Sequence, residues 1–413
     1  MAFPNIGNTC YANSILSMLM ASNTFHSFLS DTSNHFHSCP QYIRYLQQWS
    51  TQSRKSSKPK RTPNEDDMVS FFQEISTTME TYGIEWQEQN DSLDFLHALF
   101  TKIHEDTSSI QCRRLSHQPE REDRTKLKME PYHWFSSSLP HVEYFRLRLL
   151  ELSLNQPYAW SDIERLHQSK RATHIQRKNT RARKLIDSYF HQTPSLQTIY
   201  SNPWKSKPYL QEHPITFYTN HSLLQDLIEI KVYEQIVCPH CLGYTEMFSS
   251  QSYIMLEPTK KTIREAFNHW LSDEYVELYT CTQCSTTSNA RIFRFLLNQP
   301  SLLLLVFRRF QQRRNGSFQK NKSSIQLSKS LRIQSKLFPC PPYKLCSFTN
   351  HHGTLQYGHY TSICRYHVQR QKKNEMIEQW FLIDDDTVQP CLKQDTLFQL
   401  PQPDVYCVLY EKE

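Results

Sequence analysis

Two short cysteine pairs constrain the fold of this chain more than any other feature of its sequence. The first is CPHC, with Cys238 and Cys241, and the second is CTQC, with Cys281 and Cys284. A C-x-x-C pair presents two thiolates to one tetrahedral ion, so two pairs complete a four-cysteine site of the kind that holds structural zinc. A redox-active motif, the alternative, needs one pair at the start of a helix. The 39 residues in between, 242–280, exceed the ~15–20 of a simple zinc ribbon. We therefore expect a folded excursion that brings the two pairs together.

Composition excludes several classes of protein. The chain has 413 residues, 38% of them hydrophobic, and a formal net charge of +7. No apolar run approaches the ~20 residues that a membrane span requires. The apolar run ILSMLMA near the start has neither a preceding basic residue nor a cleavage site, so no signal peptide is expected. We therefore expect the 12 cysteines to be reduced, in the cytoplasm or nucleus, and to serve in metal binding or catalysis.

Hydrophobic periodicity divides the chain into a helical part and a strand-rich part. Residues 1–104 are mostly helical by pattern, with clear helices predicted within 66–79 and 89–106. Later segments favour strands, including a continuously buried strand in SLLLLVFRRF and an alternating, half-buried strand in DVYCVLYE. The span 105–210 is polar and basic, with short amphipathic helical pieces.

One cysteine stands apart from the two pairs. In NIGNTCYANS, Cys10 follows Asn8 and Thr9, which favour a helix N-cap, and precedes apolar residues at helical spacing. A thiol in the first helical turn faces unpaired backbone N–H groups, which stabilise an anion, and this is how a nucleophilic cysteine is placed. The alternative is a small buried residue that happens to begin a helix.

The C-terminal third offers partners for such a nucleophile. The segment HHGTLQYGHY contains His359, and the later segment LIDDDT contains Asp384 and Asp385. Cysteine hydrolases of the papain type use cysteine, histidine and a carboxylate or amide in this chain order. Only 6 glycines occur in the chain, and Gly353 and Gly358 both lie in the HHGTLQYGHY segment, which indicates tight backbone geometry there.

Together these segments resemble the ubiquitin-specific protease family of cysteine deubiquitinases. The resemblance covers residues 1–104 and about 225–413. It is carried by the cysteine box from Asn5 to Ser14, the QNDSLDFL segment from Gln89 to Leu96, the four paired cysteines, the LNQPSLLLLVFRRF strand, the histidine box from Gly358 to Thr361, Trp380 and the pair Asp384–Asp385. A departure is the extra polar stretch 367–379, expected to extend a loop away from the site.

The resemblance implies an α+β, papain-like cysteine protease fold made of a helical thumb, a β palm and zinc-bearing β fingers. A single catalytic domain would span 1–413. Its parts would be the thumb at 1–104, a basic insertion at 105–210, the fingers and the start of the palm at 211–310, and the remaining palm at 311–413. One structural Zn²⁺ would hold the fingers, and no cofactor would take part in the chemistry.

The resemblance also implies a role for each site residue. Cys10 would attack the carbonyl of the C-terminal glycine of ubiquitin. His359 would act first as a general base and then as a general acid. Asp384 would orient His359, while Asp385 would assist it or take its place, so the choice between the two stays open. Asn5 and the backbone N–H of Cys10 would stabilise the oxyanion.

Other functions are compatible with parts of the sequence. The same fold could serve a protease for another ubiquitin-like modifier, or a catalytically weak module that binds ubiquitin. A zinc-dependent nucleic-acid binder would leave the cysteine and histidine boxes unexplained. Expected partners are ubiquitin and ubiquitinated proteins, with no membrane, and we expect a monomer. The basic run Arg165–Lys184 has eight basic residues and no acidic one. It is either a solvated surface, a docking site for an acidic partner or nucleic acid, or a nuclear import signal, for which KPKR at 58–61 is a second candidate.

Overall fold

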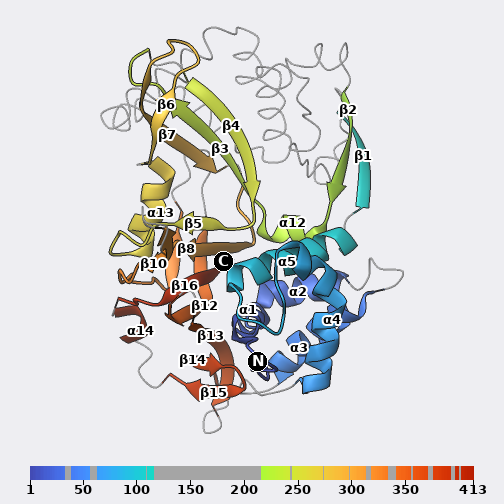
Figure 1. Ribbon diagram of the computed structural model, residues 1–413. Coiled ribbons are helices and arrows are strands. Elements are labelled where there is room, and N and C mark those ends of the chain that lie inside the picture. The colour runs from blue at the N-terminus through green and yellow to red at the C-terminus, as the bar shows by residue number, and fades with distance from the viewer. Residues whose placement is uncertain are drawn as a thin grey trace.

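A computed structural model gives the fold of the chain, with helices gathered on one side of a large sheet (Figure 1). The residues that the structure describes are 1–32, 39–55, 63–107, 109–115, 215–241, 244–272, 274–296, 298–312, 318–333, 341–354, 357–370, 375–391, 396–399 and 401–413. Statements about the structure refer to these residues. None of their helices is long and apolar enough to span a membrane.

The helical side corresponds to the expected thumb. It consists of α1 (Cys10–Met20), α2 (Asn23–Thr32), α3 (Gln41–Lys55), α4 (Glu65–Thr81), α5 (Ser92–Thr107) and the later α12 (Leu223–Ile228). The helices predicted within 66–79 and 89–106 are therefore confirmed. Asp91 caps α5, because its Oδ1 accepts the Leu93 N–H at 2.8 Å. The expected boundary at residue 104 falls inside α5, which continues to Thr107.

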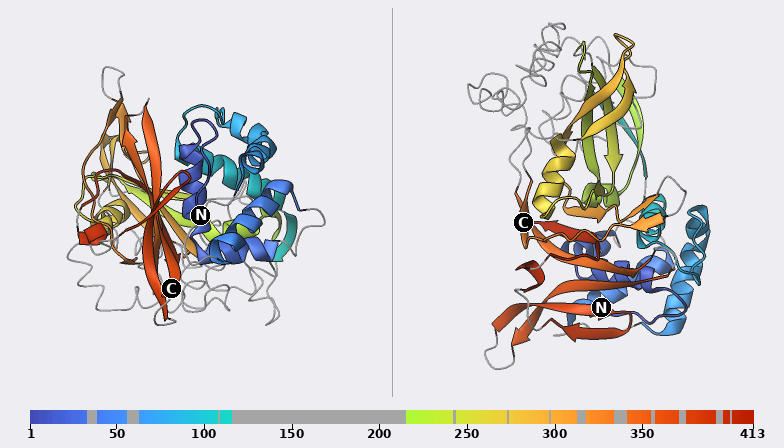
Figure 2. Two further views of the ribbon diagram at one scale, coloured as in Figure 1. Left: turned by 90° about the horizontal axis from the view of Figure 1, so that it is seen from below. Right: turned by 60° about the vertical axis from the view of Figure 1, so that its left-hand side comes forward.

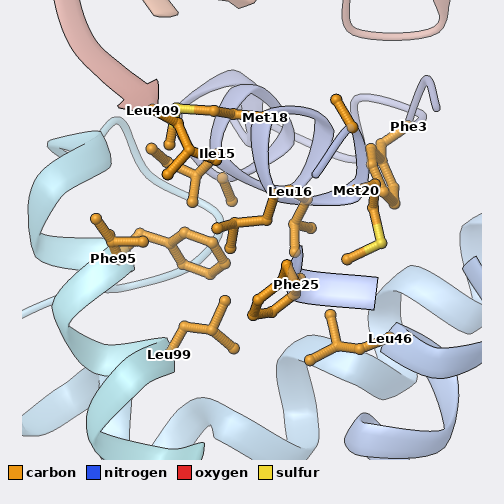
Figure 3. Packing of buried hydrophobic residues seen from close by; sticks show 14 of the residues in the cluster. Phe3, Ile15, Leu16, Met18, Met20, Phe25, Leu46, Phe95, Leu99 and Leu409 are labelled. Carbon is orange, nitrogen blue, oxygen red and sulfur yellow. The ribbon is translucent and has the colours of Figure 1, made fainter. Parts of the chain in front are cut away.

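Helix α1 lies at the centre of this side and every one of its residues is buried. Figure 3 shows its side chains packed among those of α2, α3 and α5, with Leu16 facing Phe25 and Leu99. Two side chains of the sheet donate to backbone carbonyls of its last turns: Cys364 Sγ to Ser17 O at 3.4 Å, and Ser347 Oγ to Met18 O at 3.0 Å. Helix α1 is thereby fastened to the sheet that carries the histidine box.

The palm is an eight-stranded sheet in the order β15-β14-β13-β12-β16-β8-β5, with β11 also paired to β12. Its strands are β5 (Ile254–Leu256), β8 (Leu302–Phe307), β11 (Ser330–Arg332), β12 (Pro342–Gly353), β13 (Gly358–Arg370), β14 (Glu375–Asp384), β15 (Thr387–Pro390) and β16 (Val405–Lys412). Neighbours pair antiparallel except β5 and β8, which are parallel. The stretch 367–379 contributes to the long β13–β14 pairing, which continues as far as Arg370 opposite Glu375.

Both faces of the central strands are covered. In β8, Leu302, Leu304 and Val306 join the cluster around α1, whereas Leu303 and Leu305 join a second cluster on the opposite face. The buried strand predicted from SLLLLVFRRF is confirmed. The half-buried pattern predicted for DVYCVLYE is wrong, because β16 is buried on both faces from Val405 to Glu411. Tyrosine and cysteine occupy its apparently polar positions; they are buried in the core, and the hydroxyls of Tyr406 and Tyr410 donate to Asp91 and to Ser328 O.

A second sheet stands apart from the palm, in the position expected for the fingers (Figures 1 and 2). Its order is β4-β3-β7-β6, formed by β3 (Ile230–Val237), β4 (Tyr244–Gln251), β6 (Tyr275–Thr280) and β7 (Thr287–Leu296). Helix α13 (Ile263–Ser272) connects it to the palm, and the Arg294 guanidinium of β7 lies 5.1 Å from the Trp270 ring centroid of this helix. The excursion predicted between the cysteine pairs thus contains β4, β5, α13 and β6.

An antiparallel pair of strands follows α5 and precedes α12. β1 (Ser109–Leu115) pairs with β2 (Ile215–His221) over seven positions, so Leu115 lies opposite Ile215. The basic run 165–184 belongs to the intervening segment and lies outside the described residues, as does KPKR at 58–61. After β2 the chain returns to the thumb, because Leu224 and Leu227 of α12 belong to the cluster around α1.

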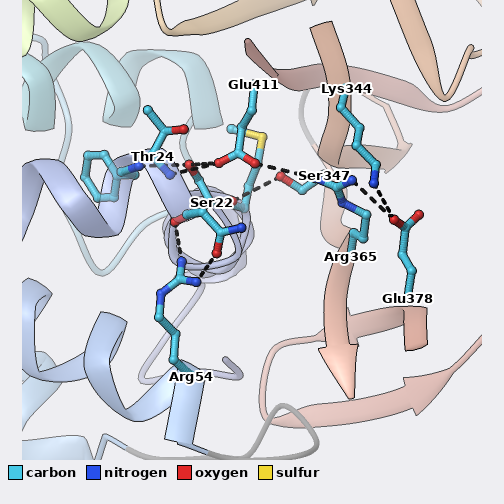
Figure 4. Close-up of polar contacts among 11 residues, drawn as sticks. Ser22, Thr24, Arg54, Lys344, Ser347, Arg365, Glu378 and Glu411 are labelled. Carbon is cyan, nitrogen blue, oxygen red and sulfur yellow. Dashed lines mark hydrogen bonds and ion pairs between the residues drawn. The ribbon is translucent and has the colours of Figure 1, made fainter. Parts of the chain in front are cut away.

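A buried polar network joins thumb and palm at the far end of α1 (Figure 4). Glu411 of β16 accepts from Ser22 Oγ at 2.6 Å and from the Thr24 N–H at 3.0 Å, at the start of α2. Arg365 of β13 faces the other carboxylate oxygen of Glu411 at 3.5 Å, and Arg54 of α3 donates to the Ser22 carbonyl. A carboxylate at a helix N-terminus is favourable, so Glu411 both caps α2 and ties it to the sheet.

Candidate active site

The loop that precedes α1 presents Cys10 at the first position of the helix, with its side chain 5% exposed. Gly7 and Asn8 have φ values of +110° and +52°, so the chain turns sharply just before the helix. Asn5 holds this turn, because its Oδ1 accepts the N–H groups of Thr9 at 3.0 Å and Gly7 at 3.3 Å. Thr9 occupies the N-cap position of α1, but its side chain forms no capping hydrogen bond. The Asn8 side chain does not cap the helix either, because its Nδ2 donates to Gln87 O.

His359 lies at the start of β13, where it meets the residues expected from the sequence. Its Nε2 donates to Asp384 Oδ1 at 2.6 Å. The pKa of His359 is raised to about 9, first by its hydrogen bond with Cys10 and then, against the opposing effect of burial, by Asp384. Since Nε2 serves Asp384, Nδ1 is the ring nitrogen left for the sulfur. The three residues therefore form a chain from carboxylate to imidazole to thiol.

The neighbouring Asp385 makes different contacts. It adopts a left-handed φ of +48° in the turn after β14, and its carboxylate accepts from Asn5 Nδ2 and Asn13 Nδ2, each at 2.8 Å. Burial raises the pKa of Asp385, while hydrogen bonds from the two asparagines oppose this effect. Its carboxylate lies within 4.8 Å of the imidazole, but His359 Nε2 forms its hydrogen bond with Asp384. Asp385 is thus placed to orient Asn5.

A cleft of about 260 Å³ leads to Cys10. Its lining residues come from both sides of the molecule: Asn8, Cys10, Tyr11, Gln89, Asn90, Asp91, Phe310, His351, Gly358 and Tyr360. Asp91 accepts the Tyr406 hydroxyl at 2.7 Å, and burial raises the pKa of Asp91 to about 6. Sequence reasoning gave no function to Asn13, Phe310 or Tyr406. The first two lie within motifs that signalled the family, whereas nothing in the sequence distinguishes Tyr406.

Gly358 has no room for a side chain. A Cβ on this residue would lie 2.0 Å from His351 Nε2 and 3.0 Å from Thr354 O. The His351 ring is buried between the rings of Phe310 and Tyr360, at centroid distances of 5.2 and 4.6 Å, and burial lowers its pKa to about 4. A neutral imidazole therefore packs directly beneath the backbone that leads into His359. The sequence-based expectation of tight geometry at this glycine is confirmed.

The four paired cysteines meet at the tip of the fingers. Cys238 Sγ lies 3.7 Å from Cys284 Sγ, and Cys241 Sγ lies 3.6 Å from Cys281 Sγ. All four sulfurs lie within 4.8 Å of one another. A tetrahedral site with Zn–S bonds of about 2.3 Å has sulfur–sulfur edges of about 3.8 Å. The donor set and its spacing therefore fit a metal ion, as the sequence predicted.

A thiol at a helix start, a histidine on the facing strand and a carboxylate 2.6 Å from it define a cysteine hydrolase site of the papain type. The family model for ubiquitin carboxyl-terminal hydrolases matches residues 2–410, so the chain belongs to this family of cysteine hydrolases. The family expected from the sequence is thereby confirmed.

Curated relatives share a limited part of their length with the chain. Human ubiquitin carboxyl-terminal hydrolase 43 is 26% identical over 181 residues, which cover 37% of this chain and 15% of the relative. Ubiquitin carboxyl-terminal hydrolase 8 of Saccharomyces cerevisiae is 23% identical over 193 residues, which cover 42% of this chain and 39% of the relative. The matches thus span well under two thirds of either relative.

Solved structures confirm the expected fold. The SAGA DUB module Ubp8/Sgf11/Sus1/Sgf73 bound to ubiquitin aldehyde matches with a TM-score of 0.55 at 16% identity, covering 100% of this chain and 69% of that chain. The same module in another structure gives a TM-score of 0.54 at 15% identity, covering 100% and 67%. At these identities the likeness concerns the fold alone.

Proposed function

We propose that the chain is a thiol-dependent deubiquitinase that hydrolyses the peptide or isopeptide bond after the C-terminal glycine of ubiquitin. The observation that carries the proposal is the hydrogen-bonded set of Cys10, His359 and Asp384 at the end of a cleft, in a chain that belongs to this hydrolase family. A similar fold that has been solved with ubiquitin aldehyde supports the choice of substrate.

In this proposal Cys10 Sγ attacks the carbonyl carbon of the substrate's terminal glycine. His359 then gives its proton to the leaving lysine amine, and a thioester between Cys10 and the glycine remains. His359 next takes a proton from water, and the hydroxide attacks the thioester carbonyl. The C–S bond then breaks, His359 returns the proton to the Cys10 sulfur, and the free carboxylate leaves. Asp384 keeps the imidazole oriented through both steps.

The oxyanion of each tetrahedral intermediate would be held by Asn5 Nδ2 and the backbone N–H of Cys10. One proton of Nδ2 is engaged by Asp385 at 2.8 Å, which leaves the other free to point at the substrate. The Asn5 carbonyl is committed to Thr9 and Gly7, so the amide cannot present its oxygen instead. Asp385 therefore serves the oxyanion site, and Asp384 serves His359.

We also propose that one zinc ion binds the four cysteines and holds the fingers, without a part in the chemistry. Ubiquitin and ubiquitinated proteins would be the partners, with the enzyme acting as a monomer inside the cell, where thiols stay reduced. The basic run 165–184 would dock an acidic partner or nucleic acid rather than take part in hydrolysis.

Labelling with a panel of modifiers tests the proposal directly. Ubiquitin and related ubiquitin-like proteins, each carrying a C-terminal electrophile, are incubated with the wild type and with the Cys10→Ala variant. We expect a covalent adduct with the ubiquitin probe that the variant does not form. A preferred adduct with another modifier would assign the chain to that modifier. Ubiquitin binding without any adduct would show a catalytically weak binding module.

A further inference from the structure

Asn13 makes contacts that the mechanism above does not explain. It lies in α1, one turn after Cys10, and is 2% exposed. Its Nδ2 donates to Asp385 Oδ1 at 2.8 Å and to Pro4 O at 3.2 Å. Its own Oδ1 is buried and has no hydrogen-bond partner among the described residues.

This asymmetry identifies the part of the side chain that matters. A buried carbonyl oxygen without a partner is costly, because it has lost its hydrogen bond to water. The opposite orientation of the amide would place that oxygen against the Asp385 carboxylate and the Pro4 carbonyl, where it would be repelled. Asn13 therefore acts here through its NH₂ group, as a donor to two acceptors.

The two oxygens of Asp385 lead from Asn13 to the oxyanion site. Oδ1 accepts from Asn13 and Oδ2 accepts from Asn5, while the Asp385 backbone carbonyl accepts the Phe3 N–H at 3.1 Å. Asn5 is anchored at its other end by Thr9. The rotation of the Asp385 carboxylate, and with it the direction of Asn5 Nδ2, thus depends on the donor at residue 13.

We propose that Asn13 is a positioning residue of the oxyanion site, which acts through Asp385 to aim the Asn5 amide at the reacting carbonyl. The inference rests on the proposed function, because the direction of the Asn5 amide matters only if an oxyanion forms during acyl transfer at this site. Asn13 itself need not touch the substrate. Any change that removes its donor should therefore affect the transition state more than substrate binding.

Exchanging donor and acceptor across the contact provides a sharp test. Asn13→Asp places two carboxylates face to face, which loses the bond and adds repulsion. In Asn13→Asp combined with Asp385→Asn, the introduced amide can accept from Asn5 with its oxygen and donate to the introduced carboxylate with its nitrogen. We expect the single variant to lower kcat roughly tenfold or more with KM nearly unchanged. The double variant should recover part of the loss, because it restores the contact with residue 385 but not the hydrogen bond to Pro4 O.

The pH dependence separates positioning from stability. In Asn13→Asp, one proton shared by the two carboxylates restores a donor, so activity relative to wild type should rise as the pH falls and that proton is bound. The other titratable groups near Asp385 are His359 and Asp384 on the sheet and Asp386 in the same turn. Both enzymes share these three groups, so the activity ratio at each pH removes the part of their titration that the substitution leaves unchanged.

Two controls and one independent measurement complete the experiment. Asn64→Asp makes the same change in the exposed cap of α4, and Ile75→Val lowers stability in the thumb core; neither should show the pH effect. Wild-type turnover of a ubiquitin substrate tests the proposed function separately. Without any substrate, the NMR signal of the Asn5 side-chain amide should shift in Asn13→Asp and return in the double variant. An unchanged Asn5 signal, or additive losses in the double variant, would overturn the inference.

Discussion

Gly358→Ala is the substitution whose consequence the structure defines most sharply. The new Cβ would lie 2.0 Å from His351 Nε2 and 2.7 Å from Cε1, whereas ordinary contacts are 3.4–4 Å, so the ring edge would have to retreat by more than 1 Å. The rings of Phe310 and Tyr360 enclose His351 and leave it little room to move. Overpacking of this kind typically costs ~1–3 kcal/mol, and we expect a value of about 2–3 kcal/mol here.

The assay combines thermal unfolding with a double-mutant cycle. A cost of about 2–3 kcal/mol corresponds to a fall in Tm of roughly 3 °C for a chain of this size. Turnover should fall by roughly 100-fold, because Gly358 precedes His359 and a displacement of about 1 Å at a catalytic group has this effect. In the His351→Ala background the space is vacated, so adding Gly358→Ala should cost little more.

Gly83→Ala is the matched control for this prediction. Gly83 has a φ of +69° but nothing within 4 Å of an added Cβ, so alanine there meets backbone strain without a clash. Its variant should lose some stability and keep its turnover. The reasoning would be refuted if Gly358→Ala melts and turns over as the wild type does, or if its cost is the same with and without the His351 ring.

Three further predictions concern the catalytic pair, the metal and the insertion. Cys10→Ala removes the bond that most raises the pKa of His359, so the NMR titration midpoint should fall from about 9 toward 6.5. Because the folded-state pKa is raised, the stabilisation from protonated His359 is complete below pH 6.5 and is lost as the pH rises through about 9. The Tm of the wild type should therefore exceed that of Cys10→Ala by less and less as the pH rises from 6.5 to about 9. An unchanged His359 titration midpoint in Cys10→Ala would contradict the pairing. Cys281→Ser should abolish the one zinc per chain found by metal analysis and weaken ubiquitin binding, and a fully active, zinc-free wild type would disprove this role. Deletion of 165–184 should leave turnover of a minimal ubiquitin substrate nearly unchanged while altering localisation or the choice of physiological substrate, and lost turnover without unfolding would place the segment in the catalytic machinery.

The parts of the site that sequence reasoning located are those whose chemistry is local. Cys10 lies between residues that favour a helix start and apolar residues at helical spacing. Cys238 and Cys241 are recognised as metal-binding residues by their C-x-x-C spacing alone. The order of Cys10, His359 and Asp384 then followed from the chemistry of cysteine hydrolases. In the structure His359 Nε2 binds Asp384 Oδ1 at 2.6 Å, and Cys10 raises the pKa of His359.

Contacts between distant segments were beyond such reasoning. Asn13 and Asp385 are 372 positions apart, and no local pattern shows that the second aspartate of the pair faces the asparagines rather than His359. The pairing of β1 with β2 was missed for the same reason, because the two strands are brought together across the whole span 116–214. Burial of β16 on both faces depends on neighbours that cover it, which its own alternation cannot reveal.

The place of β16 in the palm has a consequence for the order in which the protein is made. This strand lies between β12 and β8, which are both synthesised earlier, and it also caps α2 through Glu411. While residues 405–412 are still missing, the sheet that carries His359 lacks its middle strand, and α1 lacks part of the surface on which it rests. Pairings of such long sequence separation form late in folding. A nascent chain that already displays Cys10 should therefore remain without an aligned histidine, and catalytic competence should arise only when synthesis of the catalytic domain is almost finished.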